Sequence, residues 1–177
     1  AILTGLVYSR FARPRSYILF SRQALISPYR GGTALMFRLV SYKDRHNLTD
    51  ANIIVNLVLN VEENGRPVYK FYSLALERQH IDSLNMNWTV VHPIDERSPL
   101  QHFTPEDLEH AQAEVFVQLT GFDEVFSTTV VSKTYYFFTE IVSGAKFIPM
   151  YRESDDDTTT ILELNKLNEF ETVSLPA

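Results

Sequence analysis

The chain has 177 residues, 45% of them hydrophobic and 21% charged, and this length and composition are typical of one globular domain rather than a disordered segment. It contains no cysteine, which excludes a disulfide framework, a thiolate metal site and a cysteine nucleophile. The net charge is −6, but residues 1–22 carry four arginines and no acid, so the rest of the chain is strongly acidic and is not expected to bind nucleic acid.

The chain begins with an uncharged, mostly apolar stretch, AILTGLVY, which is followed by Arg10, Arg13 and Arg15. Eight residues cannot span a bilayer, because a spanning helix needs about 20 apolar residues. Arginines directly after an apolar end are nevertheless typical of the cytoplasmic exit of a transmembrane helix, where they meet anionic headgroups. The same residues also fit a buried first strand followed by solvated arginines, and the pattern alone leaves both interpretations open.

Residues 52–61, NIIVNLVLNV, alternate with a period of two. The odd positions are all apolar, whereas the even positions include Asn52, Asn56 and Asn60. Such alternation predicts a β-strand with one buried face and one wet face. The following ENGRP stretch, residues 63–67, contains an Asn-Gly pair that tolerates the positive φ angles of a tight turn, so we predict a hairpin with the aromatic-rich run VYKFYSLAL.

Other strand-like runs are separated by Gly-Gly, Asp-Glu and acidic turn segments. They are residues 17–21, 33–40, 88–92, 114–120, 127–138, 146–150 and 160–164. One helix is predicted at TPEDLEHAQ, because Thr104 is a typical N-cap, Pro105 suits the first helical position, and the two acids that follow favour the positive end of the helix dipole. Many short strands and one or two short helices predict an all-β fold in which two sheets stack as a sandwich.

The segment HPIDERSP contains His92, Asp95 and Ser98, the residue types of a hydrolytic triad. Triads are assembled by tertiary geometry and rarely lie within seven residues between two prolines. We therefore interpret the segment as a rigid turn in which the Asp95 carboxylate accepts hydrogen bonds from nearby amides. The other histidines lack metal-site spacing and no glycine-rich phosphate loop is present, so no catalytic residue, metal or cofactor is predicted.

Several segments, in order, resemble the cytoplasmic region of inward-rectifier potassium channels. They are FARPR after the apolar start, ALISPYRGGTALMFRLV, NLTDANI, WTVVHPIDERSPL followed by a TPEDL helix start, VQLTGFDEVFSTTV and YYFFTEIVSGAKFIPMY. The resemblance spans nearly the whole chain and is closest to the prokaryotic branch. It implies an immunoglobulin-like β-sandwich at residues 17–177, preceded at residues 1–16 by the end of the pore-lining inner transmembrane helix and a basic linker.

The resemblance also implies which residues border the ion pathway. Asp50 matches a position that is acidic in many relatives and faces the cytoplasmic pore, and the alternation predicts the same wet face for Asp50 and Asn52. Thr120 stands where strongly rectifying relatives have a glutamate, so strong block by polyamines is not expected. In the GFDEVFST loop, Phe122 and Ser127 are the predicted constriction residues, although the loop residues alone indicate only an ordinary β-turn.

As such a channel region, the protein is expected to be no enzyme, to form a homotetramer that extends the path of potassium ions, and to lie on the cytoplasmic side of a multi-pass membrane channel. Arg10, Arg13 and Arg15 are expected to face anionic membrane lipids. Animal relatives carry a longer basic run here that binds an activating phosphoinositide, and Ser16 and Tyr17 make that activation doubtful. The alternatives are a stand-alone β-sandwich that binds carbohydrate or protein through Tyr and Phe, and a small hydrolase that uses His92.

Overall fold

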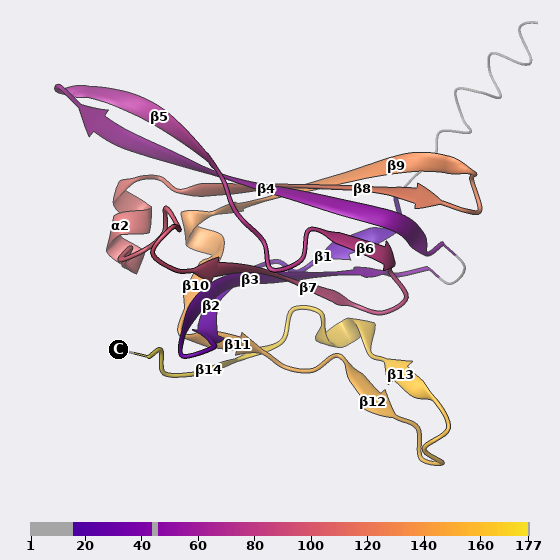
Figure 1. Ribbon diagram of the computed structural model, residues 1–177. Helices are drawn as coiled ribbons and strands as arrows, with labels where there is room; N and C mark the ends of the chain where they lie inside the picture. Colours follow the sequence, from indigo (N-terminus) through magenta and orange to yellow (C-terminus); the bar gives the residue numbers. More distant parts are fainter. Residues whose placement is uncertain (1–15, 44–45, 177) are drawn as a thin grey trace, which may run out of the picture.

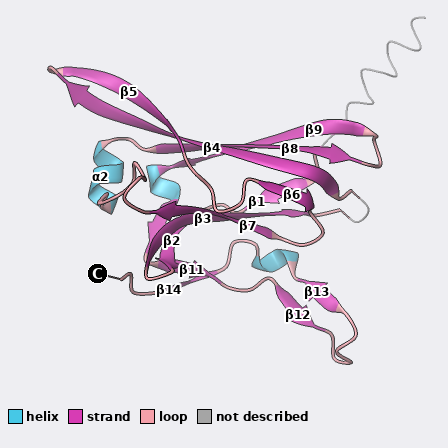
Figure 2. Cartoon of the chain, in the orientation of Figure 1, coloured by secondary structure: helices cyan, strands magenta, loops and turns pink. Residues whose placement is uncertain are grey.

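The computed structural model describes residues 16–43 and 46–176, and strands predominate in this part of the chain (Figure 1, Figure 2). The apolar start and Arg10, Arg13 and Arg15 lie outside the described residues, so what was predicted for them stays a prediction. Two sheets stack face to face, and a smaller layer of C-terminal strands lies below the first sheet (Figure 1). The predicted all-β sandwich is confirmed.

The first sheet is built around β3 (Gly32–Ser41). One edge of β3 pairs with β7 (Trp88–Ile94), and the other edge pairs in turn with β2 (Ala24–Tyr29) and β1 (Ile18–Phe20), all antiparallel. A short strand, β10 (Ile141–Ser143), extends this sheet by pairing parallel to β2.

The second sheet is built around the long strand β4 (Leu48–Glu63). One edge of β4 pairs with β8 (Glu114–Asp123), which in turn pairs with β9 (Thr128–Phe137). The other edge pairs with β6 (His80–Ser83) and then with β5 (Arg66–Ser73). The sheet order is therefore β5-β4-β8-β9, with β6 beside the first part of β4.

The predicted period-two pattern of β4 is confirmed by its burial. Ile53, Val55 and Leu57 point into the space between the two sheets and are at most 2% exposed, whereas Asn52 on the other face is exposed. These side chains pack in one core with inward residues of β3 and β8. Burial of apolar surface stabilises a fold by roughly 25 cal/mol per Å². This shared core is therefore the main stabilising contact between the sheets.

The predicted hairpin and the predicted helix are also confirmed. Asn64 and Gly65 connect β4 to β5 with φ angles of 53° and 74°. Helix α2 (Pro105–His110) begins with a capping box, in which the Thr104 hydroxyl accepts from the Asp107 amide and the Asp107 carboxylate accepts from the Thr104 amide. These contacts involve residues within three positions of each other, which is why the sequence was sufficient to predict them.

The C-terminal layer consists of short elements that follow the second sheet. Their bounds are β11 (Ala145–Phe147), β12 (Tyr151–Glu153), β13 (Thr160–Leu162), β14 (Phe170–Thr172) and the 3₁₀ turns η1 (Phe138–Glu140) and η2 (Leu164–Lys166). The pairs are β11 with β14 and β12 with β13, both antiparallel. Val40, on the face of β3 that points away from the sandwich core, packs with Met150 and Leu167 of this layer.

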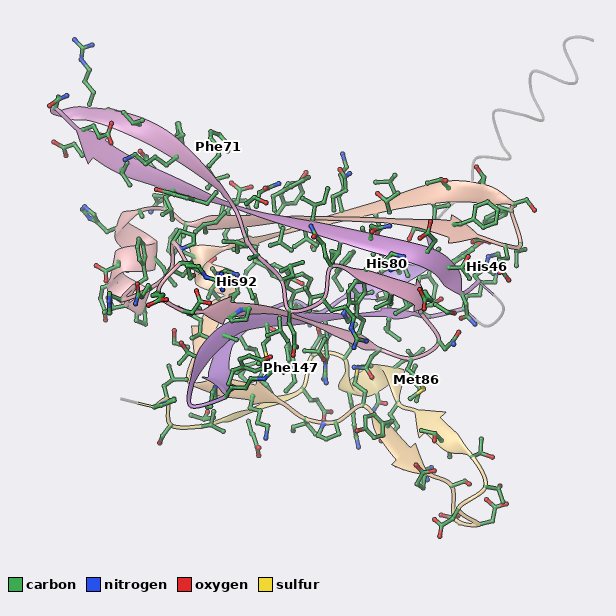
Figure 3. All side chains as sticks on the ribbon, viewed as in Figure 1. His46, Phe71, His80, Met86, His92 and Phe147 are labelled. Atoms are coloured by element: carbon green, nitrogen blue, oxygen red, sulfur yellow. The ribbon has the colours of Figure 1, made fainter. Side chains whose placement is uncertain are left out.

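Arg38 attaches the C-terminal layer to β3. The residue is 2% exposed, and its guanidinium donates to four backbone carbonyl oxygens of this layer, those of Ile148, Lys166, Leu167 and Glu169. The Phe147 ring lies 4.4 Å from its central carbon, between the first sheet and the layer (Figure 3). Burial lowers the pKa of Arg38 to about 10, so the side chain is still a cation at neutral pH.

Some strand predictions were incomplete. The run ALISPY was not predicted as a strand, although it forms β2, in which Pro28 lies near the end and pairs with Thr33. Residues 146–150 were predicted as a strand, but β11 ends at Phe147 before Pro149, which has no amide hydrogen to donate to a ladder. Four short strands, β6, β10, β12 and β14, were missed because three or four residues carry too little alternation to identify.

Candidate functional site

The outer face of β4 and β8 brings together most of the residues predicted to border an ion pathway. Asn52 and Thr120 lie directly opposite each other in the β4–β8 register. Phe122 follows two residues later on the same face of β8 and is partly exposed. Asp50 precedes Asn52 on β4, and Ser127 lies beyond them in the β8–β9 loop. We call Asp50, Asn52, Thr120 and Phe122 the polar strip.

Asp50 lies at an irregularity of β4. The pairing of β4 with β8 shifts register between Thr49 and Asn52, and Asp50 has a φ of 50°. The even-numbered residues of β4 are therefore on the outer face as far as Asp50, but the pattern ends there, because Leu48 is buried. The Asp50 carboxylate is 80% exposed, and its Oδ1 lies 2.7 Å from Nε2 of His80 on β6. The predicted exposure of Asp50 is confirmed, while its role in an ion pathway stays a prediction.

Asp123, the last residue of β8, shapes the β8–β9 loop. Its Oδ1 accepts hydrogen bonds from the amides of Val125, at 2.8 Å, and Phe126, at 3.1 Å. Ser127, at the end of the loop, has a φ of 51°. An aspartate carboxylate that accepts from the amides two and three residues later is typical of an Asx turn, so local hydrogen bonds define the shape of this loop.

The second carboxylate oxygen of Asp123 binds a histidine from another segment. Its Oδ2 lies 3.0 Å from Nδ1 of His46, between β3 and β4, and the two side chains are 1% and 10% exposed. Burial by itself raises the pKa of the Asp123 carboxyl, but the hydrogen bonds from His46 and from the loop amides outweigh it, so the pKa lies below its usual value. The carboxylate is therefore charged at neutral pH.

Aromatic rings enclose this buried pair. The Tyr17 ring centre lies 4.4 Å from that of His46, and the Phe126 ring centre lies 5.1 Å from it. The ammonium of Lys43 lies 4.6 Å from the centre of the Tyr17 ring. The start of the described chain, the segment before β4 and the β8–β9 loop thus meet in one cluster, at the end of the sandwich where Figure 3 labels His46. We call Tyr17, His46, Asp123 and Phe126 the loop-end cluster.

Sequence reasoning missed His46, His80 and Asp123 as parts of a site. His46 and Asp123 are 77 residues apart, and His80 and Asp50 are 30 residues apart. No spacing rule for helices or strands connects such positions, so the only available signal was an acidic residue beside a predicted loop.

The HPIDERSP segment is only partly the predicted turn, because His92, Pro93 and Ile94 are the last residues of β7 and the turn begins at Asp95. Nδ1 of His92 lies 2.6 Å from the carbonyl oxygen of Ala75, which can only accept, so Nδ1 carries a proton. Nε2 lies 2.7 Å from Oγ of Ser98, whose hydroxyl donates to the neutral ring. The Asp95 carboxylate accepts from the backbone amide and guanidinium of Arg97, at 2.9 and 3.2 Å.

This arrangement is not that of a hydrolytic triad. The carbonyl oxygen of Ala75, and not a carboxylate, orients His92, and Ser98 is buried. Burial lowers the pKa of the His92 imidazole, which favours the neutral ring. His92 therefore connects the segment after β5 to the turn after β7.

Residues 16–43 and 46–176 contain neither a helix that could span a membrane nor a cluster of metal-binding side chains. In this part of the chain no helix has the length and hydropathy needed to cross a membrane. The His, Asp and Glu side chains described by the structure form no group of three or more that could hold a metal ion.

Comparisons with known proteins agree with the motifs. The family model of the inward rectifier potassium channel C-terminal domain matches residues 18–177. The inward rectifier potassium channel Kirbac3.1 of Paramagnetospirillum magnetotacticum is 32% identical over 170 residues, which cover 96% of this chain and 57% of that protein.

More distant relatives come from animals. Inward rectifier potassium channel irk-1 of Caenorhabditis elegans is 29% identical over 83% of this chain and 28% of its own length. Inward rectifier potassium channel 4 of Homo sapiens is 29% identical over 86% of this chain and 36% of its own length. The chain thus spans 57% of the bacterial relative and about a third of the animal relatives. The part matched is a channel domain and not an enzyme. The chain belongs to the inward rectifier potassium channel C-terminal domain family.

Proposed function

We propose that this chain is the cytoplasmic pore and gating domain of a homotetrameric inward-rectifier potassium channel, located on the cytoplasmic side of the cell membrane. Family membership supports the channel assignment. The single observation that carries the pore assignment is the polar strip, which joins an exposed carboxylate, an amide and a hydroxyl on one solvent-facing sheet surface. Membership of a channel-domain family also disfavours the stand-alone binding module.

In this proposal the polar strips of four copies face a common water-filled axis. Four Asp50 carboxylates would raise the local concentration of potassium ions by their summed potential, which is screened beyond about 8 Å at physiological salt. Thr120 contributes a hydroxyl where a carboxylate would strengthen that potential, so strong block by polyamines is not expected. Phe122 and Ser127 border the narrowest part of the proposed path.

The loop-end cluster supports a route for gating. Residues 1–16 are proposed to be the end of the inner helix and its linker, with Arg10, Arg13 and Arg15 against anionic lipids. Tyr17 follows this segment directly and contacts His46, which binds Asp123 at the base of the β8–β9 loop. A movement of the linker would therefore reach the proposed constriction through a short chain of packed side chains.

The proposal is tested by thiol modification in the full-length channel. Asp50→Cys and Asn52→Cys variants are reconstituted in liposomes and treated with a thiosulfonate that carries a trimethylammonium group, while potassium flux is followed. We expect flux to fall several-fold, because each modified side chain places a permanent cation beside the path. This chain contributes no native cysteine to the background.

The matched control is Asp155→Cys, in the exposed turn between β12 and β13. Its modification should leave flux unchanged. Equal flux before and after modification at both Asp50→Cys and Asn52→Cys, with labelling verified by mass spectrometry, would show that the polar strip does not border the path.

A further inference from the structure

A pocket lies away from both the polar strip and the loop-end cluster. Its volume is about 370 Å³, which is within the range of about 300–1,000 Å³ that is typical of small-molecule sites. The β2–β3 turn, the segment after β5 and the turn after β7 line it. Figure 3 labels His92, one of the lining residues, towards the opposite end of the sandwich from His46. The pocket therefore lies where the first sheet meets the edge of the second.

Hydrogen bonds hold the floor of this pocket in one shape. His92 Nδ1 donates to the carbonyl oxygen of Ala75, and the Ser98 hydroxyl donates to His92 Nε2. The amide of Glu77 donates to the carbonyl oxygen of Val91, 2.8 Å away. These contacts connect the segment after β5 to β7 and to the turn that follows it. A ligand would thus meet a pocket that is already formed.

Two exposed ion pairs belong to the lining. Arg30 Nη2 lies 2.7 Å from Glu77 Oε1, and Arg97 Nη2 lies 3.2 Å from Asp95 Oδ2. The two arginine side chains are 74% and 85% exposed. Exposed ion pairs contribute little to stability, because water competes for the charges and salt screens them. Such a pair can exchange partners easily, provided that neither charge is left alone.

The backbone holds Arg30 in an unusual conformation. Arg30 and Gly31 form the two-residue turn between β2 and β3, with φ angles of 47° and 81°. The first position of such a turn is usually Asn, Asp or Gly, because most other side chains are strained at positive φ. The Arg30 guanidinium carbon lies 5.0 Å from the centre of the Tyr29 ring. Strain of this kind is concentrated at binding sites, and here it places a guanidinium beside the pocket.

Tyr29 contributes a hydroxyl to the same side of the pocket. The Glu77 carboxylate raises the pKa of the Tyr29 phenol, so the hydroxyl is protonated at neutral pH. Its oxygen is buried, and no group among the described residues forms a hydrogen bond of ordinary geometry with it. Buried polar groups normally have a partner, so this hydroxyl would gain from a polar ligand atom beside Arg30.

The charges of the lining select the kind of ligand. A simple anion would pair with Arg30 and leave Glu77 without a partner, and a simple cation would do the reverse. An α-amino acid carries a carboxylate and an ammonium on the same carbon atom, so it can insert between the two side chains and satisfy both. Its own side chain would then meet Leu76, Pro93 and Pro99, the apolar part of the lining. This surroundings favours an aliphatic side chain.

We propose that this pocket binds a small zwitterion, an α-amino acid with an aliphatic side chain. The ligand carboxylate accepts from Arg30 and from the Tyr29 hydroxyl, and the ligand ammonium donates to Glu77. Because the lining comes from both sheets, a bound ligand connects them and stabilises the folded chain by mass action. The site does not depend on the proposed function, since all of these residues belong to one copy of the chain.

The test is equilibrium dialysis of radiolabelled L-leucine against the purified full-length channel. We expect saturable binding with a dissociation constant in the millimolar range or tighter. Two analogues of leucine separate the two charges, because isoamylamine lacks the carboxylate and isocaproate lacks the ammonium. Each analogue should compete at least tenfold more weakly than leucine does, since it leaves one member of the Arg30–Glu77 pair without a partner.

Substitutions test the same contacts from the side of the protein. Arg30→Gln and Glu77→Gln should each weaken leucine binding at least tenfold. The matched controls are Lys70→Gln and Glu63→Gln, which break an exposed ion pair of the β4–β5 hairpin that lies outside the pocket lining. These controls should bind leucine as the unmodified channel does. All four replaced side chains are 39% or more exposed, and circular dichroism verifies that each variant folds.

Three results would overturn the site. They are the absence of saturable leucine binding to the unmodified channel, equal competition by leucine and by either analogue, and unchanged binding in both pocket variants. Equal losses in the pocket variants and in the control variants would also overturn it, because net charge and not the pocket would then explain the effect. None of these results bears on the proposed function, which potassium flux after thiol modification decides separately.

Discussion

Two histidine–aspartate pairs lie near the beginning of β4, and their nitrogen–oxygen distances are similar. His46 Nδ1 lies 3.0 Å from Asp123 Oδ2, and His80 Nε2 lies 2.7 Å from Asp50 Oδ1. Their surroundings differ, because the side chains of the first pair are 10% and 1% exposed and those of the second are 43% and 80% exposed. The shorter pair is expected to be the weaker one, since water competes for exposed charges and salt screens them.

The difference also separates two roles. Asp123 accepts three hydrogen bonds, two of them from amides of the β8–β9 loop, so losing its charge would leave buried donors without a partner. Asp50 keeps most of its carboxylate in water, which is what its proposed place beside an ion pathway requires. The buried pair holds the β8–β9 loop, whereas the exposed pair fits the proposed role of Asp50 in attracting cations.

The largest expected effect of a substitution within the two pairs is that of Asp123→Ala. It removes the acceptor for the Val125 and Phe126 amides and for His46, and we expect the free energy of unfolding to fall by about 2–3 kcal/mol. Urea unfolding of the purified chain measures it. Asp155→Ala, in an exposed turn, is the control and should change the free energy of unfolding by less than about 0.5 kcal/mol. Equal urea midpoints for the two variants would contradict the expectation that Asp123 stabilises the fold.

The pH dependence of the same group gives a smaller effect. Because the pKa of Asp123 is lowered in the folded protein, its stabilisation is complete above the unfolded value of about 3.9 and is lost as the pH falls through that value towards the folded pKa. Asp123→Asn should therefore flatten the loss of stability between about pH 5 and pH 3, measured by urea midpoints. A slope identical to that of the unmodified chain would show that Asp123 carries no such linkage.

The smallest effect is expected for the exposed pair. A double-mutant cycle of Asp50→Ala and His80→Ala should give a coupling energy of about 0.2–1 kcal/mol at neutral pH, and it should shrink in high salt. The readout is again the urea midpoint. A coupling above about 2 kcal/mol would remove the distinction between the two pairs, because it would mean that exposure does not weaken the second one.

Much of the fold was predictable where the cause is local. The period-two pattern of β4, the Asn-Gly turn and the capping box at Thr104 involve residues close in sequence, and the structure has all three. The third layer was not predictable in the same way. Arg38 lies in an apolar strand, but its acceptors are backbone carbonyl groups up to 131 residues later, and such groups carry no side-chain signature.

The candidate site was predictable in part. The family motifs led to Asp50, Asn52, Thr120 and Phe122, and the structure brings these residues onto one face. The reason given for Asp50 was incomplete, since a bulge and not strict alternation ends the pattern there. Arg10, Arg13 and Arg15 lie outside the described residues, and their contact with lipid stays a prediction.

By itself the sequence determined the all-β class, the buried face of β4 and the family, because alternation, turn residues and ordered motifs are properties of short segments. Only the tertiary structure decided that His46 binds Asp123 beneath Tyr17, and that Asn52 of β4 lies opposite Thr120 of β8. The physical reason is that strand register and packing between sheets bring distant residues together, and no local pattern specifies those partners.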